Sequence, residues 1–247
     1  MRRLFGYLIA ILVILLGWHL TALAIHSTAL PTPLETLPML QRFASQLLPD
    51  FLTSFYRVVV AMILGTVLAM PLGLAVGRSP RLDALLAPIL YILYPIPKIV
   101  LLPLLLVLLG LADAPKIVLI AITIFFQVLV TVRDAAKAVP EGAVLSVRSL
   151  GASRFGVFTN VVIPASLPEL FTALRISSGT AVAILFFAEA IAGNTGLGYF
   201  IVDSWAMINY PRMFAGIIVM AFLGVLLYEI FDFAERRLTR WRRVKTA

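Results

Sequence analysis

Long apolar segments alternate with short polar connections along the chain. Segments of about 20 apolar residues are long enough to cross the hydrocarbon core of a bilayer as helices. The pattern predicts six spans, the third of them broken by prolines, at residues 4–25, 51–77, 90–111, 117–132, 168–192 and 214–233. Because lipid-facing backbone must satisfy its own hydrogen bonds, every span is expected to be helical. The chain is therefore predicted to be an all-α integral membrane protein, with a single transmembrane domain over residues 1–247.

Composition supports this class and excludes several kinds of chemistry. Of the 247 residues, 62% are apolar and only 13% are charged, whereas a soluble domain has about 45–50% apolar and about 25% charged residues. The sequence contains no cysteine, which excludes disulfides, thiolate nucleophiles and cysteine-bound metals. Its two histidines, His19 and His26, are too few for a multi-histidine metal site and are interpreted as an interfacial pair. We expect no catalytic residue and no metal site in this chain.

Basic residues predict the orientation of the spans, because loops rich in Lys and Arg stay in the cytosol. The net charge is +8, and most basic residues fall in alternate connections. We therefore place both termini in the cytosol. Arg2 and Arg3 before an apolar run also resemble a signal peptide, but the length of the run favours a retained span. The basic residues near the C-terminus are interpreted as a contact with anionic lipid, not with nucleic acid: Arg236, Arg237, Arg240, Arg242, Arg243 and Lys245.

One polar segment, residues 140–168, stands out between the fourth and fifth spans. It predicts two short helices that meet at residues 150–152, with Ser153 as the N-cap of the second helix. Pro164 and Pro168 are expected to stop this helix and start the next one, since proline lacks the N–H that a helix interior needs. A cytosolic helix pair between two spans suits a docking surface rather than a catalytic site.

Two aromatic residues on the second short helix sharpen this interpretation. Phe155 and Phe158 lie three positions apart and share one helix face. Exposed aromatic side chains on a cytosolic helix suit insertion into a groove of a partner protein. An amphipathic helix lying on the lipid surface fits the periodicity equally well.

The same segment resembles the cytosolic loop signature of permease subunits of binding-protein-dependent ABC importers. That signature has a Glu-Ala-Ala triplet, three residues, a glycine, nine residues and then Ile-x-Leu-Pro. Gly151 and Pro164 match it, and Val161 and Ile163 are conservative replacements. The triplet is absent, since its positions hold Leu145, Ser146 and Val147.

Further stretches resemble the nitrate, sulfonate and taurine branch of these permeases. They are Pro95-Ile96-Pro97-Lys98, Ala188-Glu189-Ala190 and the glycine-rich run 193–199, Gly-Asn-Thr-Gly-Leu-Gly-Tyr. With the loop signature, the resemblance covers about residues 51–243. It implies a six-helix permease of the type I importer fold, with residues 133–164 as the cytosolic coupling segment.

The resemblance also implies partners and a function. A homodimer of permeases would form the pore, a cytosolic ABC ATPase would bind ATP and magnesium, and an external binding protein would deliver a small solute such as nitrate, a sulfonate or taurine. This chain lacks the Gly-x-x-x-x-Gly-Lys-[Ser/Thr] motif, so ATP hydrolysis is expected in the partner subunit. The residues expected to dock the ATPase are Leu145, Gly151, Ala152, Arg154, Phe155, Phe158 and Pro164.

Candidates for the transport pathway come from the fifth span and the loop after it: Ser178, Gly179, Glu189 and Asn194. Small residues also serve ordinary helix packing, so both roles remain open. Glu189 is expected either to line an outer gate or to pair with Arg212. Arg175 and Lys98 are expected to extend to the membrane surface rather than to contact an anion.

Two other function classes compete with the importer permease. A secondary transporter would need acidic residues near the bilayer midplane and an internal repeat, and the sequence shows neither clearly. A membrane scaffold would use the helix pair only to recruit a cytosolic protein. ATP dependence of transport separates the importer from the secondary transporter, and an absence of flux would favour the scaffold.

Overall fold

The computed structural model describes residues 2–241, with side chains from Phe5 onward, and every regular element in this range is a helix. The predicted all-α class is confirmed. Arg242, Arg243 and Lys245 of the basic C-terminus lie outside the described residues. The helices are α1 (Arg2–Ile25), α2 (Pro33–Arg42), α3 (Ala44–Arg78), α4 (Pro80–Leu93), α5 (Leu102–Leu109), α6 (Ala114–Lys137), α7 (Glu141–Ser149), α8 (Arg154–Val157), α9 (Ile163–Ala192), α10 (Leu197–Ala206) and α11 (Tyr210–Leu238), with a 3-10 turn η1 (Lys98–Leu101) and a π turn η2 (Phe158–Val162).

Five helical stretches are long and apolar enough to cross a membrane, and a bent pair of helices makes a sixth, as the sequence predicts. The bent pair is Pro80–Leu93 and Lys98–Leu109, which meet at 81°. The third span therefore begins at Pro80 rather than near residue 90. Its early start has a local cause: the Ser79 hydroxyl accepts the N–H of Leu82 at 3.4 Å, and proline is favoured at the first helical position.

The bend in the third span coincides with the Pro-Ile-Pro sequence at residues 95–97, where proline removes backbone donors. Lys98 satisfies the carbonyl groups left free there. Its buried ammonium donates to the carbonyl oxygens of Leu93, Tyr94 and Ile96 at 2.7, 3.0 and 2.7 Å. The expectation that Lys98 extends to the membrane surface is therefore wrong, because the broken helix offers it acceptors inside the protein.

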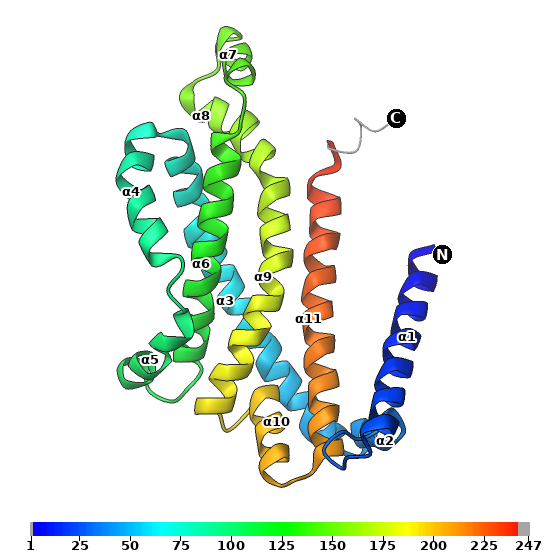
Figure 1. Cartoon of the computed structure of the whole chain (residues 1–247). Helices are drawn as coiled ribbons and strands as arrows, with labels where there is room; N and C mark the ends of the chain where they lie inside the picture. Colours follow the sequence, from blue (N-terminus) through cyan, green and yellow to red (C-terminus); the bar gives the residue numbers. More distant parts are fainter. Residues whose placement is uncertain (1, 242–247) are drawn as a thin grey trace. The chain divides into compact units, whose positions relative to one another are not determined.

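Contacts divide the chain into two compact units. The first unit consists of the residues up to Ser54 together with Glu189–Phe222, and the second of Phe55–Ala188 together with the residues from Leu223 onward. The assignment of residues 1–247 to one domain stays a prediction. In the second unit, α7 and α8 lie beyond one end of α6, and α5 lies at its other end (Figure 1).

Within the second unit, α3 packs closely against α6 through small residues at every fourth position, residues 61, 65, 69, 73 and 77. Ala61 and Ala69 are fully buried. A Cβ atom on Gly65 would lie 2.7 Å from the carbonyl oxygen of Ala121, and one on Gly73 would lie 2.8 Å from that of Leu129. Small residues at this spacing let helix backbones approach closely in membranes. Sequence reasoning missed this stripe, although its four-residue period is visible in the sequence.

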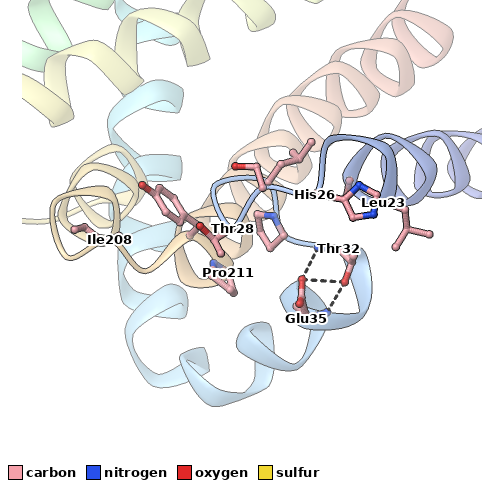
Figure 2. Close-up of a pocket in the computed structure, with 12 residues that line it drawn as sticks. Leu23, His26, Thr28, Thr32, Glu35, Ile208 and Pro211 are labelled. Carbon is pink, nitrogen blue, oxygen red and sulfur yellow. Dashed lines mark hydrogen bonds between the residues drawn. The ribbon is translucent and has the colours of Figure 1, made fainter.

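In the first unit, the connection between α1 and α2 is held by specific contacts. The Trp18 indole donates to the carbonyl oxygen of Pro31 at 2.9 Å, and its ring stacks on Phe214 with centroids 5.5 Å apart. Thr32 and Glu35 form a capping box at the start of α2. Beside it is a cavity of about 510 Å³, and Figure 2 shows the capping box at its edge together with Leu23, His26, Thr28, Ile208 and Pro211. The Glu35 carboxylate at this cavity accepts hydrogen bonds from the backbone N–H and the hydroxyl of Thr32 at 2.7 and 3.0 Å.

Candidate functional site

The segment predicted to dock a partner begins with a short helix, α7, and a turn, as expected. The expected second short helix is not separate, because α8 is the first turn of a helical stretch that runs from Arg154 to Ala192. Gly151 lies between α7 and α8 with φ +86°, a conformation that glycine adopts without penalty. Ser153 is extended, and its hydroxyl accepts the N–H of Gly156 at 3.1 Å. The predicted turn and the predicted N-cap are therefore both confirmed.

A small apolar core holds this segment against the end of α6. Val139, Val144 and Val157 are buried together, and the half-buried Val147, Ala152 and Val161 pack around them. The Arg78 guanidinium at the end of α3 donates to the carbonyl oxygen of Ala136 at 3.4 Å. Because α7 follows α6 and α8 leads into α9, a displacement of this segment would be transmitted to both long helices.

Three large apolar side chains are exposed on this segment, among polar residues such as Glu141, Arg148 and Arg154. Leu145, Leu150 and Phe155 are 60%, 86% and 77% exposed, and we call these three residues the α7–α8 apolar surface. Arg154 beside it is exposed, whereas Ala152 and Pro164 are half-buried. Phe158 is also half-buried, so Phe155 is the more exposed of the two phenylalanines.

Pro164 does not interrupt the chain where the sequence predicted a stop. The helix runs from Arg154 to Ala192, through the π turn η2 that precedes Pro164. A π turn shifts the hydrogen-bond pattern, and it occurs here just where the proline cannot donate. Two side chains satisfy neighbouring carbonyl oxygens: Asn160 donates to Gly156 at 2.8 Å and Thr159 donates to Phe155 at 3.0 Å. Pro168 likewise lies inside α9.

Glu189 is the most deeply buried of the predicted pathway residues, with no exposed surface. Its two carboxylate oxygens each lie 2.9 Å from the Ser54 hydroxyl, and one accepts the backbone N–H of Gly198 at 2.9 Å. The Ser54 oxygen in turn accepts the N–H of Leu197 at 2.9 Å. Glu189 and Ser54 thus satisfy backbone donors in the first turn of α10, which otherwise have no partner within that helix.

The predicted pairing of Glu189 with Arg212 is wrong. Arg212 instead forms an ion pair with Asp203 at 2.9 Å and donates to the Gln46 side chain at 3.2 Å. Its guanidinium also lies over the ring of Phe200, 4.6 Å from the centroid. Asp203, on α10, supplies the carboxylate that Arg212 binds. Sequence spacing alone could not identify this partner.

The other pathway candidates lie in different settings. Ser178 is buried, and its hydroxyl donates to the carbonyl oxygen of Arg175 at 2.6 Å, which is a local helix contact. Gly179 is exposed, and a Cβ atom added there would meet nothing within 4 Å. Asn194 is exposed in the loop after α9.

Arg175 does not extend to the membrane surface as predicted. It forms ion pairs with Asp232 and Glu235 of α11 at 3.0 and 2.9 Å. Arg57 was overlooked in the sequence, although a charge inside an apolar span was the available signal. It is buried and binds Asp113 at 2.6 Å. Both arginines link α-helices that are far apart in sequence.

A comparison with protein families decides the identity of the chain. Residues 61–240 match the family described as the binding-protein-dependent transport system inner membrane component. The chain belongs to this family. The permease is 32% identical over 232 residues to the taurine transport system permease protein TauC of Escherichia coli (strain K12), covering 91% of this chain and 84% of TauC. It is 29% identical over 240 residues to the nitrate import permease protein NrtB of Synechocystis sp. (strain ATCC 27184 / PCC 6803 / Kazusa), covering 92% of this chain and 86% of NrtB.

Solved structures confirm the fold of the permease. A chain of the MetNI methionine ABC transporter in an inward-facing conformation matches with a TM-score of 0.66 at 23% identity, covering 80% of the permease and 98% of that chain. A chain of an amino acid ABC transporter crystallised with histidines matches with a TM-score of 0.60 at 18% identity, covering 83% and 97%. The permease is thus a multi-pass inner membrane subunit of an ABC importer, of the type I fold and the nitrate, sulfonate and taurine branch.

Proposed function

We propose that the permease works as a homodimer that receives a small solute with an anionic group, such as nitrate, a sulfonate or taurine, from an external binding protein and passes it inward. A cytosolic ABC ATPase, which binds ATP and magnesium, docks on the α7–α8 apolar surface and supplies the energy. Both termini lie in the cytosol in this proposal, as the basic loops favour. The substrate class follows the names of the relatives, which transport taurine and import nitrate.

The observation that carries the proposal is the exposure of Leu145, Leu150 and Phe155 on a segment that is itself well anchored. Leaving large apolar side chains in water costs roughly 25 cal/mol for each Å² that a partner would bury. Aromatic and aliphatic anchors at the centre of an interface commonly dominate its binding energy. A groove in a partner protein would therefore gain most from Phe155 and its two leucine neighbours.

The residues of the docking segment have mechanical roles in this proposal. Gly151 allows the tight turn that presents both short helices on one side. The Val139, Val144 and Val157 core couples the segment to α6 and α9, so that movement of the ATPase reaches the spans. Ser178, Gly179, Glu189 and Asn194 remain candidates for the pathway and its outer gate.

Reconstitution tests the proposal. The permease and its ATPase would be placed in proteoliposomes with the binding protein, and uptake of labelled nitrate, taurine and ethanesulfonate would be measured. We expect uptake of at least one of these solutes that requires ATP and persists when ionophores collapse the ion gradients. Uptake that follows an ion gradient without ATP would instead establish a secondary transporter.

A further inference from the structure

A second polar site lies inside the membrane-spanning part of the second unit. A cavity of about 380 Å³ borders the break in the third span and is also lined by α6 and α9. We call it the break pocket, and its polar lining residues are Lys98, Thr123, Gln127 and Thr180. A volume of this size falls within the roughly 300–1,000 Å³ of small-molecule sites. Irregular backbone at membrane depth is tolerated where it is buried in protein or lines a cavity.

The charge of Lys98 is not neutralised inside the protein. Only 9% of the residue is exposed. Three carbonyl oxygens accept from its ammonium, and the Lys98 nitrogen lies 4.8 Å from the centroid of the Phe126 ring, but none of these groups carries a formal negative charge. Among the described residues Lys98 has no carboxylate partner, whereas other buried or partly buried cations do: Arg57 with Asp113, Arg133 with Asp83, and Arg175 with Asp232. A buried charge without a counter-ion is unfavourable unless an anion visits it.

Gln127, on α6, lines the break pocket and has an amide oxygen free to accept a hydrogen bond. The Gln127 amide nitrogen reaches the Thr180 hydroxyl only at 3.5 Å. Its amide oxygen is buried and has no hydrogen-bond partner in the part of the chain that the structure describes. A buried polar atom left in this way costs free energy, so the side chain gains by turning toward a ligand. Thr180 offers a hydroxyl beside it.

We propose that the break pocket is a transit site for the anionic group of the transported solute. Lys98 supplies the positive field, and Gln127 and Thr180 supply hydrogen bonds to a sulfonate, carboxylate or nitrate. An ionisable residue within a membrane span, next to a discontinuous helix, is the arrangement in which transporters bind their substrates. This inference rests on the proposed import function and names the chain's own contacts with the substrate.

The absence of cysteine from the sequence allows a direct test. Ala183, which lines the break pocket, would be changed to cysteine. The purified permease in nanodiscs would then react with anionic sulfonatoethyl methanethiosulfonate or cationic trimethylammonioethyl methanethiosulfonate. A cavity lined by one sign of charge raises the local concentration of counter-ions by about tenfold or more. We expect the rate ratio of anionic to cationic reagent to fall by about tenfold in Lys98→Gln, while Lys98→Arg keeps it.

Several controls separate the effect of the Lys98 charge from effects on folding and access. Lys98→Gln keeps an amide donor for the carbonyl groups at the break, and size-exclusion chromatography verifies that each variant is folded. Lys116→Gln removes another buried lysine that does not line this cavity, and it should leave the ratio unchanged. Rates are normalised to those of neutral hydroxyethyl methanethiosulfonate, which corrects for a change in access.

The outcomes separate this inference from the import function. An unchanged ratio in folded Lys98→Gln would overturn the transit site, whatever the result of reconstitution. Selective reaction of a purely apolar thiol reagent, with no effect of Lys98, would mean that the pocket holds a lipid chain, and it would overturn the proposal as well. A Lys98-dependent preference for the anionic reagent supports the site even if ATP-driven uptake is absent.

Discussion

The Glu189 carboxylate lies against Gly196 so closely that a Cβ atom at position 196 would fall 2.6 Å from Glu189 Oε2. Gly196 also has φ +102°, which other residues adopt only with strain. Gly151 has a similar φ of +86°, but its Cβ would meet nothing within 4 Å. These two glycines therefore separate the effect of backbone strain from that of steric overlap.

We predict that Gly196→Ala destabilises the permease more than Gly151→Ala. Both variants carry the strain of a positive φ, but only Gly196→Ala also overpacks a buried carboxylate, which typically costs about 1–3 kcal/mol. Thermal unfolding in detergent, followed by tryptophan fluorescence, measures the difference. Equal melting temperatures for the two variants would show that the Glu189 side chain moves aside without loss of stability, and would contradict the prediction.

The carboxylate itself is expected to matter through its acceptors. Glu189→Ala would leave the Ser54 hydroxyl and the Gly198 N–H without this buried partner, and an unsatisfied buried group costs about 1–3 kcal/mol. Glu189→Gln keeps one acceptor oxygen and nearly the same shape, so it should be less destabilising. The same unfolding assay compares them, and a more stable alanine variant would contradict the capping role.

The packing of α3 on α6 gives a further prediction. Gly73→Ala should destabilise the protein, because its Cβ would lie 2.8 Å from the carbonyl oxygen of Leu129. Gly17→Ala in α1 is the matched control, since nothing lies within 4 Å of that position. There the change should be neutral or favourable, because alanine is the better helix former. Stability of Gly73→Ala equal to that of Gly17→Ala would contradict close packing at this stripe.

The orientation of the spans is open to chemical labelling. Ser45 in the first turn of α3 and Ser146 in α7 are both exposed, and the prediction places them on opposite sides of the membrane. In intact cells, cysteine at Ser45 should react with a membrane-impermeant thiol reagent, and cysteine at Ser146 should react only after lysis. The reverse pattern would place α7 and α8 outside the cell and exclude a cytosolic partner there.

Local features of this fold were predictable from the sequence, and contacts between distant segments were not. The long apolar stretches and the Gly151–Ser153 turn depend on neighbouring residues, and they were identified correctly. The start of the third span was placed near residue 90 instead of at Pro80. The uninterrupted helix through Pro164 depends on η2, where Thr159 and Asn160 satisfy carbonyl groups. Proline alone does not reveal such compensation.

The partners of the buried charges illustrate the same limit. Arg175 binds Asp232 on α11, which is 57 positions away in the sequence, and no local sequence pattern predicts that contact. Arg57 and the small residues of α3 could have been identified from the sequence. A charge inside an apolar span indicates the first, and a four-residue period of small residues indicates the second. Of the docking residues, Phe155 was correctly expected to be exposed, whereas Phe158, at the start of η2, is half-buried.

Site-specific photocrosslinking tests the central claim most directly, namely that an ABC ATPase docks on the α7–α8 apolar surface. A photoreactive p-benzoylphenylalanine would replace Leu150 or Phe155 in cells, with Val107 of α5 as an equally exposed control at 84%. We expect the first two positions to crosslink to a protein that mass spectrometry identifies as an ATPase with a Gly-x-x-x-x-Gly-Lys-[Ser/Thr] motif, and position 107 not to do so. Crosslinks from Leu150 and Phe155 to lipid alone would contradict the docking role and favour a segment that lies on the membrane surface.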